Sequence, residues 1–176
     1  MGRTDHPFPV IEHLAALSRY ARSLTRDAPD AEDLVHDALV RAYDRRHSFR
    51  PDGDLRRWLF AVLHNTFIDG ARRRRVEQSR LDAAAAGAPQ SSEPDQEHAA
   101  EVARVRGAFA SLPADQRAVL HLVVSEGLSY QEAAQVLDLP IGTVMSRLAR
   151  GRAALRASPT QQTPRLRIVG GKDARD

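Results

Sequence analysis

The segment SYQEAAQVLDLPIGTVMSRLARGRAAL, residues 129–155, constrains the fold more than any other part of the chain. Ser129 and Glu132 form an S-x-x-E capping box, which predicts that a helix begins directly after Ser129. The sequence LDLP at 137–140 predicts a short turn, and a second helix follows at about Ile141. Two short helices joined by a tight turn are typical of a helix-turn-helix, whose second helix enters the major groove of DNA.

The second helix of this motif has one narrow apolar stripe when its residues are placed at about 100° per residue. The stripe comprises Val144, Leu148, Gly151 and Leu155. The opposite face has small residues around one arginine: Gly142, Ser146, Ala149, Arg150 and Ala153. Residues 141–156 include no acid, whereas a solvated helix usually alternates Glu with Lys. Because arginine reads guanine in the major groove, this face is predicted to bind DNA, with an amphipathic bundle helix as the alternative.

Composition favours a helical chain without catalytic chemistry. The hydrophobic fraction is 42% and the aromatic fraction 5%, so a core must consist mostly of Leu, Val and Ala. Cysteine is absent, which excludes disulfides, thiol catalysis and cysteine-based zinc sites. The seven histidines are scattered, and neither an HExxH motif nor a P-loop occurs, so we expect no enzyme, cofactor or metal site. His121 is expected in a core.

The basic residues are almost all arginine. The total of 26 includes one lysine, Lys172, which leaves 25 arginines (26 − 1). Arginine suits phosphate and guanine, although a GC-rich genome explains the same bias. No apolar run approaches the roughly 20 residues of a membrane span, and the N-terminus lacks a signal-peptide core. We therefore expect a soluble, cytoplasmic protein with no membrane insertion.

The chain divides into two helical blocks. The first has three predicted helices, at about 9–26, 31–49 and 55–75. Asp30 is expected to cap the second, and the third ends in four arginines. Residues 76–100 are rich in Ala, Gly, Pro, Ser and Gln and have a net charge of −4 (1 − 5), as expected of a flexible acidic linker. The second block has predicted helices at 101–110, 113–126, 130–137 and 141–156.

Taken together, these segments resemble an extracytoplasmic-function (group 4) sigma factor of the sigma-70 family. DAEDLVHDALVRAY resembles region 2.2, LRRWLFAVLHNTFIDGARRRR resembles regions 2.3 to 2.4, and residues 112–155 resemble region 4. The resemblance implies an all-α fold of two small helical domains. These are a sigma-2 helical bundle at 8–76 and a sigma-4 helix-turn-helix domain at 101–157, joined by a flexible acidic linker at 77–100 and followed by a disordered tail at 158–176.

The resemblance also implies a function in transcription initiation. Such a factor binds the β′ clamp and β flap of core RNA polymerase and directs promoter-specific initiation by recognising the −10 and −35 elements of promoter DNA. A cognate anti-sigma factor is implied as a further partner. The acidic linker either threads through polymerase channels or is an inert tether. The alternatives are a sigma-like decoy that titrates an anti-sigma factor, and a helix-turn-helix regulator that binds DNA alone.

The family's site residues transfer to matching positions. Those for core polymerase are Asp33, Leu34, His36, Asp37, Val40 and Arg41. Those for the −10 element are Arg56, Arg57, Asn65, Asp69, Arg72 and Arg73. Those for the −35 element, on the recognition helix, are Thr143, Met145, Ser146, Arg147 and Arg150. A base-capture loop is implied at 49–54.

Several of these residues have a second interpretation. Asp37 can pair with Arg41 within one helix, which contributes only a few tenths of a kcal/mol. Asp69 contacts DNA or holds Arg72 or Arg73, and the arginines at 72–75 bind phosphates or complement the helix dipole. Trp58 is a core residue or a stacking platform. His64 stands where the family commonly has arginine, which weakens one phosphate contact. Met145 is expected to form an apolar rim that touches a thymine methyl.

Overall fold

The computed structural model describes residues 9–81 and 106–157, and every regular element in these ranges is helical, which confirms the predicted all-α class. The first unit consists of η1 (Val10–His13), α1 (Leu14–Thr25), α2 (Ala28–Asp44), η2 (Arg46–Ser48) and α3 (Leu55–Leu81). The second consists of a helical turn at 106–111, α5 (Ala114–Leu120), η3 (His121–Ser125), α6 (Tyr130–Leu137) and α7 (Ile141–Ala157).

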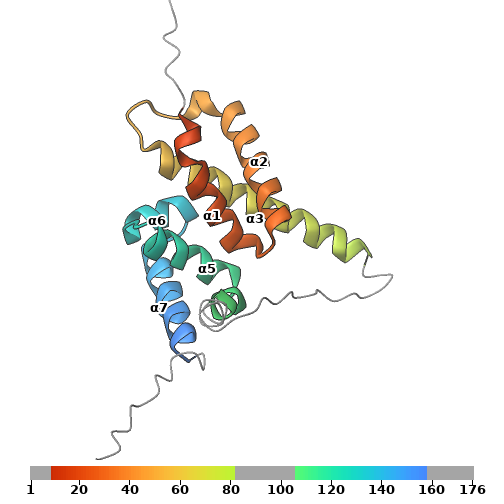
Figure 1. Cartoon of the computed structure of the whole chain (residues 1–176), viewed down its shortest axis with the longest axis vertical. Helices are drawn as coiled ribbons and strands as arrows, with labels where there is room; N and C mark the ends of the chain where they lie inside the picture. The colour runs from red at the N-terminus through yellow and green to blue at the C-terminus, as the bar shows by residue number, and fades with distance from the viewer. Residues whose placement is uncertain (1–8, 82–105, 158–176) are drawn as a thin grey trace, which may run out of the picture.

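The first unit is a bundle in which α1 and α3 both pack against α2 (Figure 1). Apolar residues of α1 recur at helical spacing, so that Leu17, Tyr20 and Leu24 lie on one buried face. The α2 residues facing them are mostly small, such as Ala31, Ala38 and Ala42, which lets the helices approach closely. From α3, Leu59, Phe60 and Leu63 complete the core.

The start of α2 differs from the prediction, because Asp27 rather than Asp30 caps the helix. The Asp27 carboxylate accepts a hydrogen bond from the Asp30 amide at 3.3 Å, and Pro29 lies in the first turn. Proline is tolerated there because the first amides of a helix have no intrahelical partner. The helix ends at Asp44, followed by the short η2, and so stops before the predicted end at 49.

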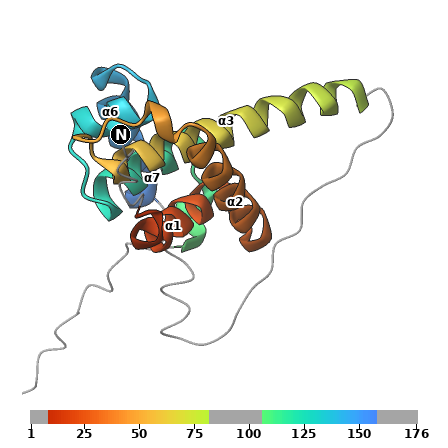
Figure 2. The same cartoon turned by 90° about the horizontal axis from the view of Figure 1, so that it is seen from above.

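Helix α3 is longer than predicted. It runs over 27 residues to Leu81, about 40 Å at 1.5 Å per residue, and its C-terminal part projects from the bundle (Figure 2). The predicted helix ended at 75, so α3 continues into the first residues assigned to the linker. The rest of the predicted linker, the start of the helix predicted at 101–110, and the predicted tail lie outside the described residues.

The second unit has the predicted helix-turn-helix. The capping box is present, with the Glu132 amide donating to the Ser129 hydroxyl at 3.2 Å and the Ser129 amide donating to the Glu132 carboxylate at 2.9 Å. Asp138, at a φ of 51°, ends α6 in the left-handed region and starts the turn. Gly151 of α7 lies so close to α5 that an added Cβ would be 2.6 Å from Leu120 Cδ1.

The two units pack against each other. Helix α6 lies on α3, and α5 lies on α1, so that α5 and α6 separate α7 from most of the first unit (Figure 1). Within the described ranges, no helix combines the length and apolar character needed to cross a membrane.

Candidate nucleic-acid interface

Helix α7 buries the stripe that the helical wheel predicted. Val144 and Leu148 are 0% and 3% exposed, Gly151 is buried and Leu155 is half-buried. Gly142, Ala149, Arg150 and Ala153 are exposed on the other side. The backbone along this face is therefore accessible to a DNA groove, with the Arg150 side chain rising from it.

The remaining recognition-helix residues lie at the edges of this face. Met145 is 51% exposed, which fits an apolar rim. Thr143 and Ser146 are half-buried, and the Ser146 hydroxyl donates to the Thr143 carbonyl at 3.0 Å. Arg147 is half-buried, and its Nε lies 3.1 Å from Asp115 Oδ2 at the start of α5. Arg150 is thus presented to solvent, whereas Arg147 is held within its own domain.

Helix α2 presents Asp33, His36, Asp37 and Val40 to solvent, and Val40 is 49% exposed. Leu34 differs from the other predicted polymerase contacts, because it is only 9% exposed and packs in the bundle core. The exposed candidates therefore form one mixed acidic and apolar face, and Leu34 supports it from beneath.

Arg41 joins α2 to α3 instead of pairing with Asp37. Its Nη1 donates to Asp69 Oδ2 at 2.8 Å. The same contact shows that Asp69 is paired with Arg41 and not with Arg72 or Arg73. Asn65, Arg72 and Arg73 are exposed along α3, as DNA contacts must be.

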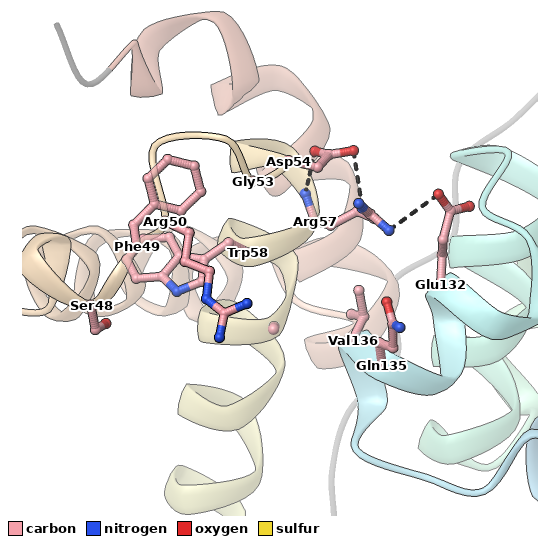
Figure 3. A pocket seen from close by; sticks show the side chains of 11 residues that line it. Ser48, Phe49, Arg50, Gly53, Asp54, Arg57, Trp58, Glu132, Gln135 and Val136 are labelled. Atoms are coloured by element: carbon pink, nitrogen blue, oxygen red, sulfur yellow. Dashed lines mark hydrogen bonds and ion pairs between the residues drawn. The ribbon is translucent and has the colours of Figure 1, made fainter. Parts of the chain in front are cut away.

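The predicted base-capture loop borders a cavity of about 310 Å³, near the lower limit for small-molecule sites (Figure 3). Phe49 and Trp58 line it with their rings 5.5 Å apart, and Trp58 is half-buried against the bundle core. The opposite wall comes from the second unit: Glu132, Gln135 and Val136 of α6. Trp58 therefore packs on the core and also lines the cavity, so a stacking role for it stays a prediction.

Arg57 lies where the loop meets α6. Its amide donates to Asp54 Oδ1 at 3.0 Å, so Asp54 caps α3, and its Nε lies 3.1 Å from Asp54 Oδ2. Its Nη1 is 3.3 Å from Glu132 Oε1 of α6. The hydrogen bonds from Ser129 lower the pKa of Glu132, with a contribution from the nearby Arg57 charge. Arg57 thus contacts a carboxylate from each unit.

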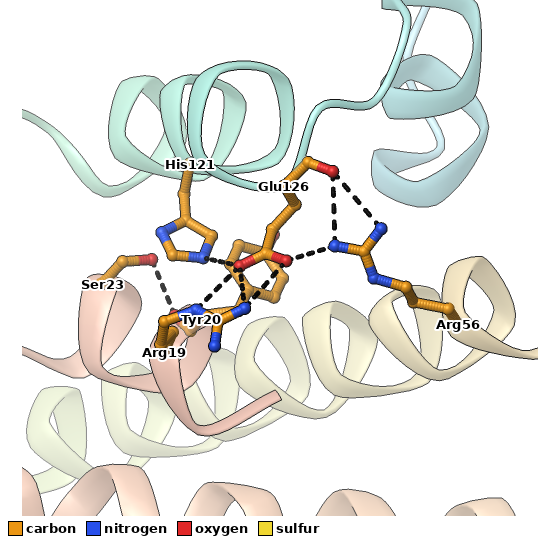
Figure 4. Close-up of polar contacts among 6 residues, drawn as sticks. All are labelled: Arg19, Tyr20, Ser23, Arg56, His121 and Glu126. Atoms are coloured by element: carbon orange, nitrogen blue, oxygen red, sulfur yellow. Dashed lines mark hydrogen bonds and ion pairs between the residues drawn. The ribbon is translucent and has the colours of Figure 1, made fainter. Parts of the chain in front are cut away.

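A cluster of polar contacts surrounds Glu126 and includes Arg56, the neighbour of Arg57 in the chain (Figure 4). Arg19 of α1 donates to Glu126 Oε1 through Nε at 3.2 Å and Nη2 at 3.1 Å. Arg56 of α3 pairs through Nη2 with Oε2 and donates to the Glu126 carbonyl at 3.3 Å. His121 Nε2 is 3.2 Å from Oε1. We call these four residues the Glu126 cluster.

The charge states in the Glu126 cluster follow from burial and pairing. Burial alone raises the pKa of Glu126, but the hydrogen bond from Arg56 and the charges of Arg19 and His121 lower it below the usual value. Burial lowers the pKa of His121 against the opposing effect of Glu126. The Glu126 carboxylate thus accepts hydrogen bonds from two arginines, and the Nε2–H of His121 donates to the same oxygen as Arg19.

The helix geometry after α5 brings His121 and Glu126 together. The chain forms a π-helical turn, η3, in which the Glu126 amide donates to the His121 carbonyl five residues earlier at 3.0 Å. In an α-helix, residues five apart point about 140° away from each other, whereas the wider π turn brings them to one face. Gly127 then ends the turn at a φ of 73°, where a side chain would be strained.

Arg117 makes a second polar link between the units. It is 3% exposed, and its Nε and Nη2 donate to the Ser23 and Leu24 carbonyls at the end of α1 at 2.7 and 2.9 Å. Its Nη1 bonds the Leu112 carbonyl. Burial and the nearby Arg26 lower the pKa of Arg117 to about 10, so it stays charged at neutral pH.

His64 is buried at the contact between the units and is not exposed to solvent as a phosphate contact would be. It is 8% exposed, and its Nδ1 is hydrogen-bonded to the Tyr20 hydroxyl at 3.0 Å. Burial, with a smaller effect of Arg147, lowers the pKa of His64 to about 4. His121 is 7% exposed and its ring stacks on that of Tyr20 with centroids 5.3 Å apart, in agreement with its expected core position.

The interface residues were not identified from the sequence. Glu126 was expected only as the last residue of the helix predicted at 113–126, and no contact across the units was predicted for Arg19, Arg117 or Glu132. Burial of Arg117 could have been predicted from a helical wheel, because Arg117 lies three residues before the buried Leu120 and so on the same face of the helix. For Glu126 the partners depend on tertiary docking. Among the described residues, no group of three or more His, Cys, Asp or Glu is placed to hold a metal ion.

Comparison with known proteins gives matches for both units. The family Sigma-70 region 2 matches residues 10–77, and the family Sigma-70, region 4 matches residues 103–155. The ECF RNA polymerase sigma factor EcfG of Rhodopseudomonas palustris is 37% identical over 148 residues, which cover 84% of this chain and 81% of that protein. The ECF RNA polymerase sigma factor SigL of Mycobacterium tuberculosis is 38% identical over 150 residues, covering 82% and 83%.

A solved structure agrees with this in three dimensions. The sigma factor RpoE in complex with the anti-sigma factor NepR from Bartonella quintana superimposes with a TM-score of 0.72 at 33% identity. The match covers 84% of this chain and 91% of that one.

Proposed function

The chain belongs to the extracytoplasmic-function sigma factors of the sigma-70 family, and we propose that it is an alternative sigma factor that directs core RNA polymerase to specific promoters. Sigma factors are not enzymes, so its chemistry is binding. The observation that carries the proposal is the exposed face of α7, where Arg150 rises from small residues over a buried apolar stripe. Its place of action would be the cytoplasm, with the polymerase.

The first unit corresponds to the sigma-2 domain and the second to the sigma-4 domain. On sigma-2, the exposed face of α2 with Asp33, His36, Asp37 and Val40 would bind the β′ clamp of polymerase, and sigma-4 would bind the β flap. Arg41 and Leu34 would support that face from within, through Asp69 and the bundle core.

For the −10 element, the cavity at the capture loop would receive an unstacked base, with Trp58 and Phe49 beside it. Unstacking a base costs a few kcal/mol, which a fitted pocket offsets. Arg56, Arg57, Asn65, Arg72 and Arg73 would contact the surrounding strand. Asp69 would act mainly by positioning Arg41.

For the −35 element, α7 would enter the major groove. Arg150 is the candidate for base recognition, with Thr143, Ser146, Arg147 and Met145 around it. We expect Arg150→Ala to lose about 1–3 kcal/mol of binding at one base pair of the element. Arg156→Ala, at the exposed end of the same helix, is the matched control. An equal loss on every sequence would instead assign Arg150 to a phosphate.

Run-off transcription tests the proposal. Purified protein with core polymerase should initiate at a subset of promoters in a genomic promoter library, and Arg150→Ala should change the selected −35 sequences. Product no higher than with core polymerase alone would contradict the function.

An anti-sigma factor is a further expected partner. The matched RpoE structure contains the anti-sigma factor NepR, and this chain shares 33% identity with that sigma factor. We expect a cognate inhibitor to bind this chain in a co-purification experiment and to suppress its run-off transcription. Because the chain has no cysteine, a thiol-based stimulus would have to act on that inhibitor.

A further inference from the structure

Three arginines of the sigma-2 unit hold two carboxylates of the sigma-4 unit. Arg19 and Arg56 bind the oxygens of Glu126, and Arg57 lies 3.3 Å from Glu132. Both carboxylates come from the segment that includes η3 and α6, so the docked sigma-4 unit covers the arginines with negative charge.

The burial of these groups is unequal. The Glu126 side chain is 1% exposed, whereas those of Arg19, Arg56 and Arg57 are 56%, 37% and 36% exposed. The arginines therefore form a surface that remains partly open to solvent. The Glu126 carboxylate is buried against it, whereas the Glu132 side chain, at 37% exposure, is as open as that of Arg57. A phosphodiester presents two anionic oxygens to guanidinium groups in the same way as a carboxylate does.

The position of this surface points to nucleic acid as the second occupant. Arg56 and Arg57 lie in the first turn of α3, directly after the capture loop, and Arg57 lines the cavity there. In the docked arrangement Glu132, Gln135 and Val136 form the far wall of that cavity. A strand whose base entered the loop would meet the arginines where the sigma-4 carboxylates now lie.

We propose that Arg19, Arg56 and Arg57 form one binding surface for the phosphates of single-stranded promoter DNA, and that Glu126 and Glu132 occupy it while the units are docked. Arg19 is the residue added by this inference. It rests on the proposed function, which assigns Arg56 and Arg57 to the −10 strand. Docking of the two units and binding of the strand then exclude each other.

A direct binding experiment without polymerase tests this. The chain has no cysteine, so Glu32→Cys on α2 and Ala154→Cys on α7, both exposed positions, allow donor and acceptor dyes to report separation of the units. The probe is a single-stranded DNA of about 16 nucleotides, the upper site size for such grooves. Energy transfer and DNA affinity are measured in the same titration over a range of salt concentrations.

We expect DNA to lower energy transfer in the otherwise unchanged chain, because the strand displaces the carboxylates. Glu126→Gln with Glu132→Gln should lower transfer before DNA is added and tighten DNA binding severalfold. In that background, Arg19→Ala should weaken binding and reduce the slope of log affinity against log salt by about 1. Arg22→Ala, an exposed arginine one turn along α1, is the matched control and should change neither quantity.

Two outcomes would overturn the inference. One is unchanged transfer and unchanged DNA affinity in the double glutamine variant. The other is an Arg19→Ala chain with the same DNA affinity and salt dependence as Arg22→Ala, which would show that Arg19 is not part of the binding surface. Failure of the proposed function has a different signature, since it would abolish promoter-specific run-off transcription while leaving this competition intact.

Discussion

The cores of the two domains and the interface between them are held together by different physical means. The cores are apolar and closely packed, with Leu63 and Leu122 at 0% exposure. The interface adds ionic and hydrogen-bonded contacts, through the Glu126 cluster and Arg117, to the packing of α6 on α3 and of α5 on α1. Apolar burial changes little with salt, whereas the Debye length falls from about 10 Å at 0.1 M to 3 Å at 1 M. From this contrast we expect the contact between the units to be more sensitive to salt than either core.

Leu63→Ala tests the apolar core of the first unit and should cause the largest loss of stability. Removal of a fully buried leucine side chain leaves a cavity and destabilises a domain by about 2–5 kcal/mol. If the interface is reversible, the loss should stay in the first unit. Hydrogen exchange should then become much faster in α1–α3 and change little in α5–α7. Equal acceleration in both units would mean that they unfold together.

Acidification tests the contribution of His64, a buried residue that lies where the core of the first unit meets the interface. Its pKa of about 4 in the fold lies below the usual 6.5, so the unfolded chain takes up a proton first as the pH falls. The contribution of neutral His64 to the free energy of unfolding is therefore present above pH 6.5, and the free energy should fall by about 3 kcal/mol as the pH falls to about 4. Urea unfolding across this range measures the loss.

His64→Gln is the control for this experiment, because it keeps a hydrogen-bonding group near Tyr20 but does not titrate. Since Arg147 of the second unit contributes to the lowered pKa, separating the units with Glu126→Gln should reduce the loss slightly. An identical pH profile for His64→Gln would show that other groups govern the transition.

Gly151→Ala should have the smallest effect on stability, and it tests the packing of α7 against α5 rather than an interaction between charges. The added Cβ would lie 2.6 Å from Leu120 Cδ1, so α7 and α5 must separate or repack, at about 1–3 kcal/mol. The better helix propensity of alanine offsets up to about 1 kcal/mol of this. Gly142→Ala, with nothing within 4 Å of the added atom, should instead stabilise the chain. Urea midpoints that shift in the same direction for both variants would contradict the packing argument.

The sequence predicted features that depend on local spacing. The capping box of Ser129 and Glu132, the buried stripe of α7 and the exposed Arg150 are all as expected, since each follows from helix geometry alone. The cap of α2 was assigned to the wrong aspartate, because Asp27 and Asp30 flank Pro29 and either can serve as a cap in a local pattern. The partners of Glu126 could not be predicted, since Arg19 and Arg56 lie 107 and 70 residues away in the chain.

The single π-helical turn after α5 makes the interface sensitive to chain length rather than to side-chain identity. Removing one residue from His121–Ser125 would restore α-helical register and rotate every later position by about 100° about the helix axis. Glu126 would then point away from Arg19 and Arg56 with its chemistry unaltered. A one-codon deletion can therefore uncouple the two halves of this molecule in a relative that retains all of the interacting residues.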